Sequence, residues 1–168
     1  MSLHTGLRWS EQLALEWKDA DFLTGILSVT RSKNGHSRQV PMNSLVRSTL
    51  MDVAAQRQRP QDPAEPIFKA PGRADRFFPP AVQQAGEALR KAGRDANRLS
   101  GYTWHSNRRT FASRLVMAGV NLRAVQELGG WRTFSMVGRY SHLAPEFLRE
   151  AVERLVGTGS GAVELSRN

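Results

Sequence analysis

The carboxy-terminal half of the chain is dominated by apolar residues at helical spacing, and glycines divide this pattern into short pieces. Apolar residues three or four positions apart predict amphipathic helices, and glycine is the residue that most often ends one. Helices are predicted over about 106–118, ended by Gly119, then 122–128, ended by Gly129 and Gly130, then 134–140, and from Pro145 to about Leu155. This half of the chain is therefore expected to be a set of short, packed helices.

The amino-terminal half contains a strong hairpin signal. Short apolar runs at 26–29 and 40–42 flank the pair Asn34-Gly35, which directly follows Lys33. Both residues of an Asn-Gly pair tolerate the positive φ that tight hairpin turns require. Two antiparallel strands are therefore predicted, with Lys33 at the tip of their hairpin.

Two further helices are predicted between the hairpin and the carboxy-terminal half. One covers 43–57 with Asn43 as its N-cap, and the other begins with Pro79-Pro80 in its first turn and ends near Gly93. The proline-rich stretch 59–66 is predicted to be a surface loop. The fold class is thus mainly α with a small antiparallel β-sheet near 23–42, an α+β domain.

The charge of the chain points to a polyanionic partner. Lys plus Arg number 24 and Asp plus Glu 15, which gives a formal net charge of +9, and all the cations except Lys18, Lys33, Lys69 and Lys91 are arginines. The planar guanidinium matches phosphate oxygens with two parallel hydrogen bonds, and nucleic acid is the commonest partner of a basic domain. A GC-rich genome that inflates arginine is the alternative explanation.

Several classes of protein are excluded by what the sequence lacks. It contains no cysteine, so disulfide frameworks, thiolate zinc sites and cysteine nucleophiles are ruled out. His4, His36 and His142 have no metal-ligand spacing, and no apolar run approaches the roughly 18 residues of a membrane span. With no signal-peptide pattern either, a soluble, cytoplasmic protein of one domain is expected.

Residues 106–128 are compatible with a helix-turn-helix DNA reader, although many helix pairs share such a turn. His105 and Arg108 lie three positions apart at the start of the first helix, so both can project from one face. Backbone amides at a helix amino terminus favour an anion. A phosphate is therefore predicted to fit between these two side chains.

Five motifs, in order along the chain, resemble the catalytic domain of the tyrosine recombinases, the phage integrase family. The motifs are Thr5-Gly6-Leu7-Arg8 with Glu11, Lys33 followed by Arg38-Gln39-Val40-Pro41, the run from Trp104 to Ser113, Glu127-Leu128-Gly129-Gly130-Trp131, and Arg139-Tyr140-Ser141-His142-Leu143. The resemblance implies a catalytic domain over 4–156, truncated at its start, with a flexible tail over 157–168. It also implies an enzyme that exchanges DNA strands through a covalent intermediate, with no metal, no other cofactor and no ATP.

The resemblance assigns the central chemistry to three residues. Arg8 and Arg108 are implied to clamp the scissile phosphate, because attack on a phosphodiester builds negative charge that cationic donors must meet when no metal is present. Tyr140 is implied to be the nucleophile, giving a 3′-phosphotyrosyl link and a free 5′-hydroxyl. Tyrosine has an ordinary pKa near 10, so the attacking phenol needs help to lose its proton.

Four supporting roles follow from the same resemblance. His105 matches the general acid/base of the family, and Lys33 matches the lysine that protonates the departing 5′-oxygen. Trp131 stands where most members have histidine and some have tryptophan, and its indole N–H can donate to the phosphate without carrying a proton. Glu11 matches an acidic support residue that orients the arginine and histidine side chains.

Each of these residues also has a simpler interpretation. Arg8 and Arg108 could be exposed helix arginines, Lys33 could blunt a hairpin tip, and Tyr140 and Trp131 could be packing residues. The chain also departs from the family pattern at 106–109, since Arg109 replaces the histidine that usually follows the second arginine. Arg109 is therefore expected to alter how the neighbouring acidic and phosphate groups are held.

The implied partner is double-stranded DNA in the bacterial nucleoid, with the full-length protein self-associating as a tetramer on it and no membrane involved. Full-length family members carry an amino-terminal DNA-binding domain and an opening helix that this chain lacks, so weak or no activity is expected of the isolated chain. Two rival functions remain open: a non-catalytic helix-turn-helix-like DNA-binding regulator, and a type IB topoisomerase that relaxes supercoils.

Overall fold

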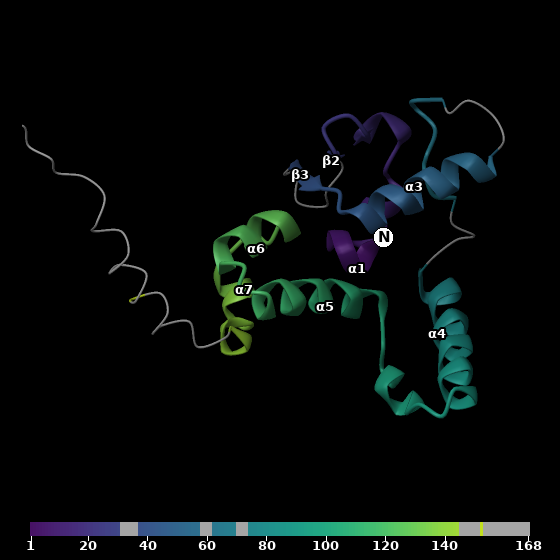
Figure 1. Cartoon of the computed structure of the whole chain (residues 1–168), viewed down its shortest axis with the longest axis vertical. Coiled ribbons are helices and arrows are strands. Elements are labelled where there is room, and N and C mark those ends of the chain that lie inside the picture. Colours follow the sequence, from purple (N-terminus) through teal and green to yellow (C-terminus); the bar gives the residue numbers. More distant parts are fainter. Residues whose placement is uncertain (31–36, 58–61, 70–73, 145–151, 153–168) are drawn as a thin grey trace, which may run out of the picture.

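A computed structural model of the chain describes residues 1–30, 37–57, 62–69, 74–144 and 152 (Figure 1). Lys33, the helix predicted from Pro145 and the tail over 157–168 lie outside these ranges, with Val152 the one described residue beyond Ala144. Among the described helices, none combines the length and hydrophobicity that a membrane span needs.

The sheet contains the predicted hairpin and one strand more. β2 (Ile26–Val29) pairs antiparallel with β3 (Arg38–Pro41), so that Leu27 lies opposite Val40, and the added strand β1 (Ala20–Asp21) pairs with the other edge of β2. Side chains alternate between the two faces of a strand. Leu27, Val29 and Val40 are accordingly buried on one face of the sheet.

A first hydrophobic core joins this sheet to the helices of the amino-terminal half. These are α1 (Ser2–Thr5), α2 (Trp9–Leu13), the 3-10 helix η1 (Trp17–Asp19) and α3 (Ser44–Gln56). As predicted, the Asn43 side chain caps α3 by accepting the N–H of Val46 at 3.0 Å. Val46 and Leu50 of α3 join Leu7, Leu15, Trp17, Ala20, Leu27, Val29, Val40 and Ile67 in this core.

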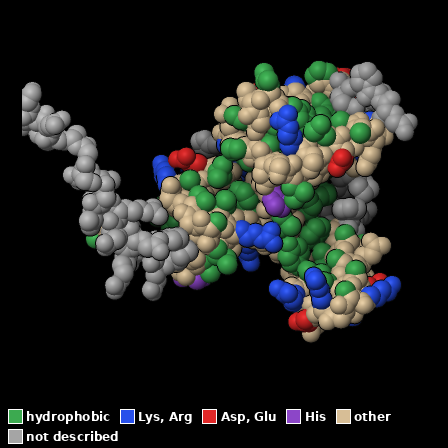
Figure 2. Space-filling view, viewed as in Figure 1, with side chains coloured by type: hydrophobic (Ala, Val, Ile, Leu, Met, Phe, Trp, Pro, Cys, Tyr) green, Lys and Arg blue, Asp and Glu red, His purple; other side chains and the backbone are tan. Residues whose placement is uncertain are grey.

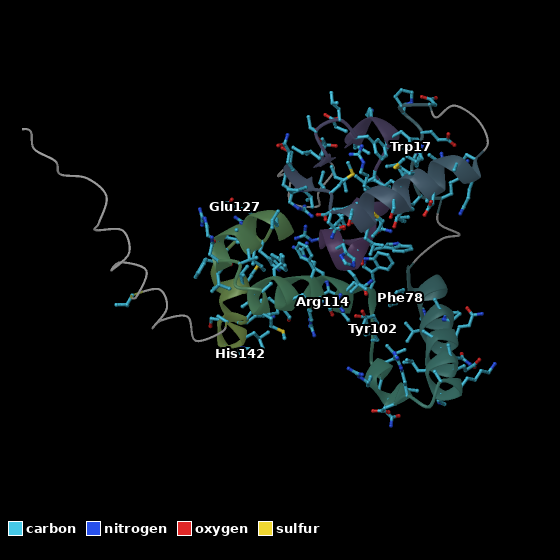
Figure 3. The ribbon with its side chains drawn as sticks, viewed as in Figure 1. Trp17, Phe78, Tyr102, Arg114, Glu127 and His142 are labelled. Carbon is cyan, nitrogen blue, oxygen red and sulfur yellow. The ribbon has the colours of Figure 1, made fainter. Side chains whose placement is uncertain are left out.

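Helix α4 (Ala74–Lys91) begins earlier than predicted and, with the 3-10 helix η2 (Ala96–Leu99), forms a lobe that stands apart from the sheet (Figure 1). Pro79 and Pro80 lie inside α4, so placing them in its first turn was wrong. Proline in a helix interior removes backbone hydrogen bonds. The residue before the two prolines, Phe78, stacks on Tyr102 at 6.2 Å between ring centroids (Figure 3). It also meets Trp104 edge-on at 5.4 Å.

The second core is helical. It is built from α5 (Trp104–Met117), α6 (Leu122–Gly129), α7 (Ser135–Gly138) and the 3-10 helix η3 (Ser141–Leu143). α5 starts slightly before the predicted position because Thr103 and Ser106 form a capping box there. Ala112, Val116, Val125 and Val137 are the buried members of this core, and α1 packs along α5 to join it to the first (Figure 1).

Candidate active site

The seam between the two cores holds charged side chains. Glu11 of α2 is only 1% exposed, which is rare for a carboxylate without partners. The backbone N–H of Arg8, the N-cap residue of α2, donates to Glu11 Oε2 at 2.9 Å, and Arg8 Nη1 donates to Oε1 at 2.5 Å. Glu11 therefore orients Arg8 through both its backbone and its side chain.

A second arginine, Arg38 at the start of β3, holds the same carboxylate. Its Nη2 donates to Glu11 Oε2 at 2.8 Å and its Nη1 to Oε1 at 3.2 Å, while its Nε donates to the carbonyl of Leu128 at 3.1 Å. Arg38 appeared in one of the sequence motifs but was given no role. Its partners lie 27 and 90 positions away along the chain, so only the folded structure identifies them.

The protonation of Glu11 follows from these contacts. Burial alone would raise its pKa, but hydrogen bonds and charge from Arg38, together with the backbone and side chain of Arg8, bring the pKa down to about 2. Glu11 is thus a carboxylate at neutral pH, neutralised by two cations. The cluster Arg8–Glu11–Arg38, called the frame below, carries one positive charge in excess.

Arg108 of α5 is buried in a different way. It is 2% exposed, and its Nη1 donates to the carbonyl of Gly6 at 2.6 Å. Its guanidinium carbon lies 4.1 Å from the centre of the Trp131 ring, in cation–π contact. Within the described residues its Nη2 is buried with no hydrogen-bond acceptor at all. A buried donor without a partner is costly, so an acceptor that reached this atom would remove a destabilising feature.

The positive charge of Arg108 is destabilised by its surroundings. Burial, and after it the positive charges of Arg8 and Arg38, lower its pKa to about 9 against the opposing effects of Glu11 and Tyr140. Arg108 remains protonated at neutral pH, because about 9 is still well above 7. An anion that enters beside it would relieve both the desolvation and the repulsion.

Trp131 reaches Arg108 because of the glycines before it. Gly130 ends α6 in the left-handed region, with φ 64°, and its carbonyl accepts a 3.4 Å hydrogen bond from Arg8 Nη2. A Cβ on Gly129 would lie 1.8 Å from the Trp131 ring, and one on Gly130 would lie 2.9 Å from Arg38. The two glycines therefore let the ring and the frame pack closely against the end of α6.

Tyr140 follows α7 and lies beside Trp131, with 6.4 Å between ring centroids. Its ring packs against the second core and is partly buried, and it interacts electrostatically with Arg108. The other tyrosine, Tyr102, is differently engaged, since its hydroxyl donates to Asn107 at 2.6 Å. Of the two tyrosines, Tyr140 is the one that interacts with Arg108, the arginine whose Nη2 lacks an acceptor.

His105 lies in the first turn of α5 and its side chain is exposed. Its pKa is lowered first by partial burial and then by the positive charges of Arg108, Arg109, Arg8 and Arg139. The imidazole is therefore neutral at neutral pH and can accept a proton. The sequence-based role of Glu11 toward this histidine has no counterpart among the described contacts of Glu11, which are with Arg8 and Arg38.

The structure thus brings together Arg8, Glu11, Arg108, Trp131, Tyr140 and His105, all of them singled out from the sequence, and adds Arg38. Lys33 lies outside the described residues. In the described part of the chain, no three His, Asp or Glu side chains converge as metal ligands would. Beside the frame lies a cationic cluster of side chains, called the pocket below, which consists of Arg108, His105, Trp131 and Tyr140.

Comparison with known proteins gives one family. The Phage integrase family model matches residues 1–146. The integrase of Salmonella phage P22 is 30% identical over 183 residues, covering 99% of this chain and 44% of that protein. Tyrosine recombinase XerA of Pyrococcus furiosus is 30% identical over 152 residues, covering 89% of this chain and 50% of that protein. The chain spans about half the length of the curated relatives it matches.

Solved structures give the same family. The Tn1549 transposon integrase in complex with circular-intermediate DNA superposes with a TM-score of 0.71 at 27% identity, covering 92% of this chain and 57% of that one. The catalytic domain of bacteriophage HP1 integrase superposes with a TM-score of 0.66 at 27% identity, covering 96% of this chain and 82% of that one. The α+β fold predicted from the sequence is thereby confirmed.

Proposed function

The chain belongs to the phage integrase family, and from that premise we propose that it cleaves and rejoins DNA at specific sites through a 3′-phosphotyrosyl intermediate, without metal or ATP. The observation that carries the proposal is the buried Nη2 of Arg108, which has no acceptor among the described residues and belongs to a guanidinium that packs on Trp131 and interacts with Tyr140. A phosphodiester oxygen supplies the acceptor and the negative charge that this pocket lacks.

Arg108 and Arg8 bind the non-bridging oxygens of the scissile phosphate. Each brings a guanidinium that is already oriented, Arg108 by the Gly6 carbonyl and the Trp131 ring, and Arg8 by Glu11. Donors placed in advance stabilise the charge that develops in the transition state without reorganisation. The indole N–H of Trp131 adds a neutral donor to the same phosphate.

Tyr140 attacks the phosphorus, and the P–O5′ bond breaks as the P–O bond to tyrosine forms. The phenolic proton passes to neutral His105, directly or through a water molecule, and Lys33 gives a proton to the departing 5′-oxygen. Rejoining is the reverse, with a DNA 5′-hydroxyl as the attacking group. Bond energy is kept in the phosphotyrosyl link, so the cycle needs no nucleotide cofactor.

The substrate is duplex DNA, as in the solved complex of the Tn1549 integrase with circular-intermediate DNA. Basic side chains on the α4–η2 lobe, namely Arg90, Lys91, Arg94 and Arg98, offer phosphate contacts away from the pocket (Figure 2). Action on the nucleoid DNA of a bacterial cytoplasm and assembly as a tetramer on that DNA complete the proposal.

A purely DNA-binding regulator is disfavoured by the way α6 is used. Val125, Gln126 and Gly129 of α6 are buried, and its last turn is tied to Arg38 and leads into Trp131. The helix pair α5–α6 therefore supports the pocket. A regulator would have no use for an arginine with a buried, unpaired Nη2 near a tyrosine.

A nicked duplex tests the proposal. The protein as its complete gene encodes it is incubated with a library of duplexes of random sequence around a nick, so that the short strand released by cleavage diffuses away and the covalent complex persists on a denaturing gel. Wild type and Tyr102→Phe should give an adduct, and Tyr140→Phe should give none. An adduct that persists in Tyr140→Phe, or its absence from wild type, would refute the proposed function.

A further inference from the structure

Arg38 makes contacts that neither a surface arginine nor a simple ion pair would make. Its side chain is 9% exposed, and each of its three guanidinium nitrogens donates to a protein acceptor. Those acceptors belong to two elements far apart in sequence, the Glu11 carboxylate of α2 and the Leu128 carbonyl at the end of α6. Arg38 is thus the point at which the sheet, α2 and α6 meet.

One side of Arg38 controls Arg8. Arg38 contacts both oxygens of Glu11, and the same two oxygens hold the backbone and side chain of Arg8. The Arg8 side chain keeps 25% of its surface exposed, so it can reach a ligand while its position is set from behind. A shift of the Glu11 carboxylate would therefore move Arg8.

The other side of Arg38 controls Trp131. Its Nε holds the Leu128 carbonyl, and its Cδ and Nη1 pass so close to Gly130 that a Cβ there would lie 2.9 Å from each. Gly130 is followed directly by Trp131, whose ring covers the Arg108 guanidinium at 4.1 Å. A shift of Arg38 would therefore move the turn that presents this indole.

We propose that Arg38 is a positioning residue that sets Arg8 and Trp131 at the correct separation on either side of the scissile phosphate. Arg38 acts through Glu11 and through the turn at Gly130 that ends α6, and it does not touch the phosphate itself. This inference rests on the proposed function and adds to it a third arginine, which the reaction requires although it is not in the pocket. A misplacement of about 1 Å of a positioning group can cost on the order of 100-fold in rate.

The test compares Arg38→Lys with a matched control, Arg57→Lys. Arg57 is also a largely buried arginine with several bonds: it pairs with Glu65 at 3.1 Å, donates to the carbonyls of Pro66 and Ile67, and stacks on Trp17. It belongs to the first core, away from the pocket. Lysine keeps the charge at both positions but cannot span several acceptors at once.

Single-turnover adduct formation at saturating DNA is measured beside DNA affinity. Arg38→Lys should lower the cleavage rate about 10- to 100-fold with affinity changed less than about threefold, whereas Arg57→Lys should leave the rate unchanged. In the double variant Glu11→Gln with Arg38→Lys, the rate should be no lower than in the slower single variant, because both act through one carboxylate. The inference would be overturned if Arg38→Lys cleaved at the wild-type rate, or if Arg57→Lys lowered the cleavage rate as much as Arg38→Lys does.

A second arm separates this inference from the proposed function. The rise in melting temperature caused by inorganic phosphate is measured without DNA. This rise in melting temperature should be present in wild type and in Arg57→Lys, and it should be reduced by more than half in Arg38→Lys. If wild type forms no adduct but shows this pattern, the proposed function fails and Arg38 still positions an anion site. The inference is refuted if phosphate raises the melting temperatures of wild type and Arg38→Lys equally, or raises neither of them.

Discussion

The frame and the pocket use the same residue type in opposite ways. In the frame, Arg38 gives every guanidinium nitrogen to a protein acceptor and pairs with a buried carboxylate. In the pocket, Arg108 donates to one backbone carbonyl and packs on one aromatic ring, and its Nη2 has no acceptor. Two other arginines are close enough to lower its pKa. Burial alone therefore does not separate a structural arginine from one that binds a ligand, whereas the balance of charge and acceptors does.

This contrast also explains why the site can be stable and reactive together. Removing one partner of a buried ion pair strongly destabilises the folded protein, because the remaining buried charge is uncompensated. The frame supplies a rigid support, and the pocket holds a positive charge that a phosphate will neutralise. The frame and the pocket should therefore respond differently to substitution and to pH.

The largest effect is expected from Arg108→Met, which removes the uncompensated charge and keeps the volume. Cleavage should fall by about 10³-fold, because an arginine that stabilises the transition state is lost. The free energy of unfolding should stay within about 1 kcal/mol of wild type or rise, because a poorly solvated cation is gone. Single-turnover adduct formation and urea unfolding measure the two quantities. A large loss of stability would mean that Arg108 belongs to the frame.

Arg38→Met should show the reverse pattern in stability. It leaves Glu11 buried with Arg8 as its remaining cationic partner, so the free energy of unfolding should fall by about 3 kcal/mol. Arg57→Met is the control, because its partner Glu65 keeps 14% of its side chain exposed and should tolerate the loss better. Equal losses in the two variants, read from urea unfolding curves, would contradict a special role for the frame.

The pH dependence of stability should carry the signature of Glu11. Its folded pKa, about 2, is below the ordinary value of 4.5, so its contribution is present above pH 4.5 and is lost as pH falls toward 2. In Glu11→Gln this loss should be missing, which makes its unfolding free energy less dependent on pH in that range. Urea unfolding at a series of pH values measures it, and parallel curves for the two proteins would refute the assignment.

The smallest effect concerns His105. Burial and four arginines lower its pKa, so neutral imidazole, and with it cleavage, should persist below pH 6.5. Arg109→Gln removes one of those charges, raises the pKa of His105 and should move the acid limb of the cleavage rate to higher pH, with a change in rate at pH 6 of less than about tenfold. Arg123→Gln on α6 is the control. An acid limb that does not move would exclude His105 as the proton acceptor.

Local patterns in the sequence were sufficient for much of the fold. The Asn43 cap and the apolar positions of 43–57 predicted α3, and Gly119 and Gly130 marked the ends of α5 and α6, because capping and periodicity act over a few residues. The start of α4 was mispredicted because it depends on ring contacts between Phe78, Tyr102 and Trp104. Those contacts join positions about 25 residues apart, which no local pattern records.

The residues of the site also divide into those that local motifs identify and one whose role depends on tertiary packing. Arg8, Glu11, Arg108, Trp131 and Tyr140 could be named because they fall within motifs that resemble a family. Arg38 stood in such a motif without a role, since an arginine beginning a strand is ordinarily exposed. Its function depends on Glu11 being buried and on the end of α6 lying beside β3, and both are properties of tertiary packing.

The identity of the nucleophile is the most direct test of the whole account. The chain has only two tyrosines, and Tyr102 is engaged with Asn107 whereas Tyr140 faces Arg108 across Trp131. The covalent complex formed on a nicked duplex is digested with nuclease and protease, and the modified peptide is sequenced by mass spectrometry. The expected product is a nucleotide joined through its 3′-phosphate to Tyr140. A nucleotide on Tyr102, or one joined through a 5′-phosphate, would contradict it.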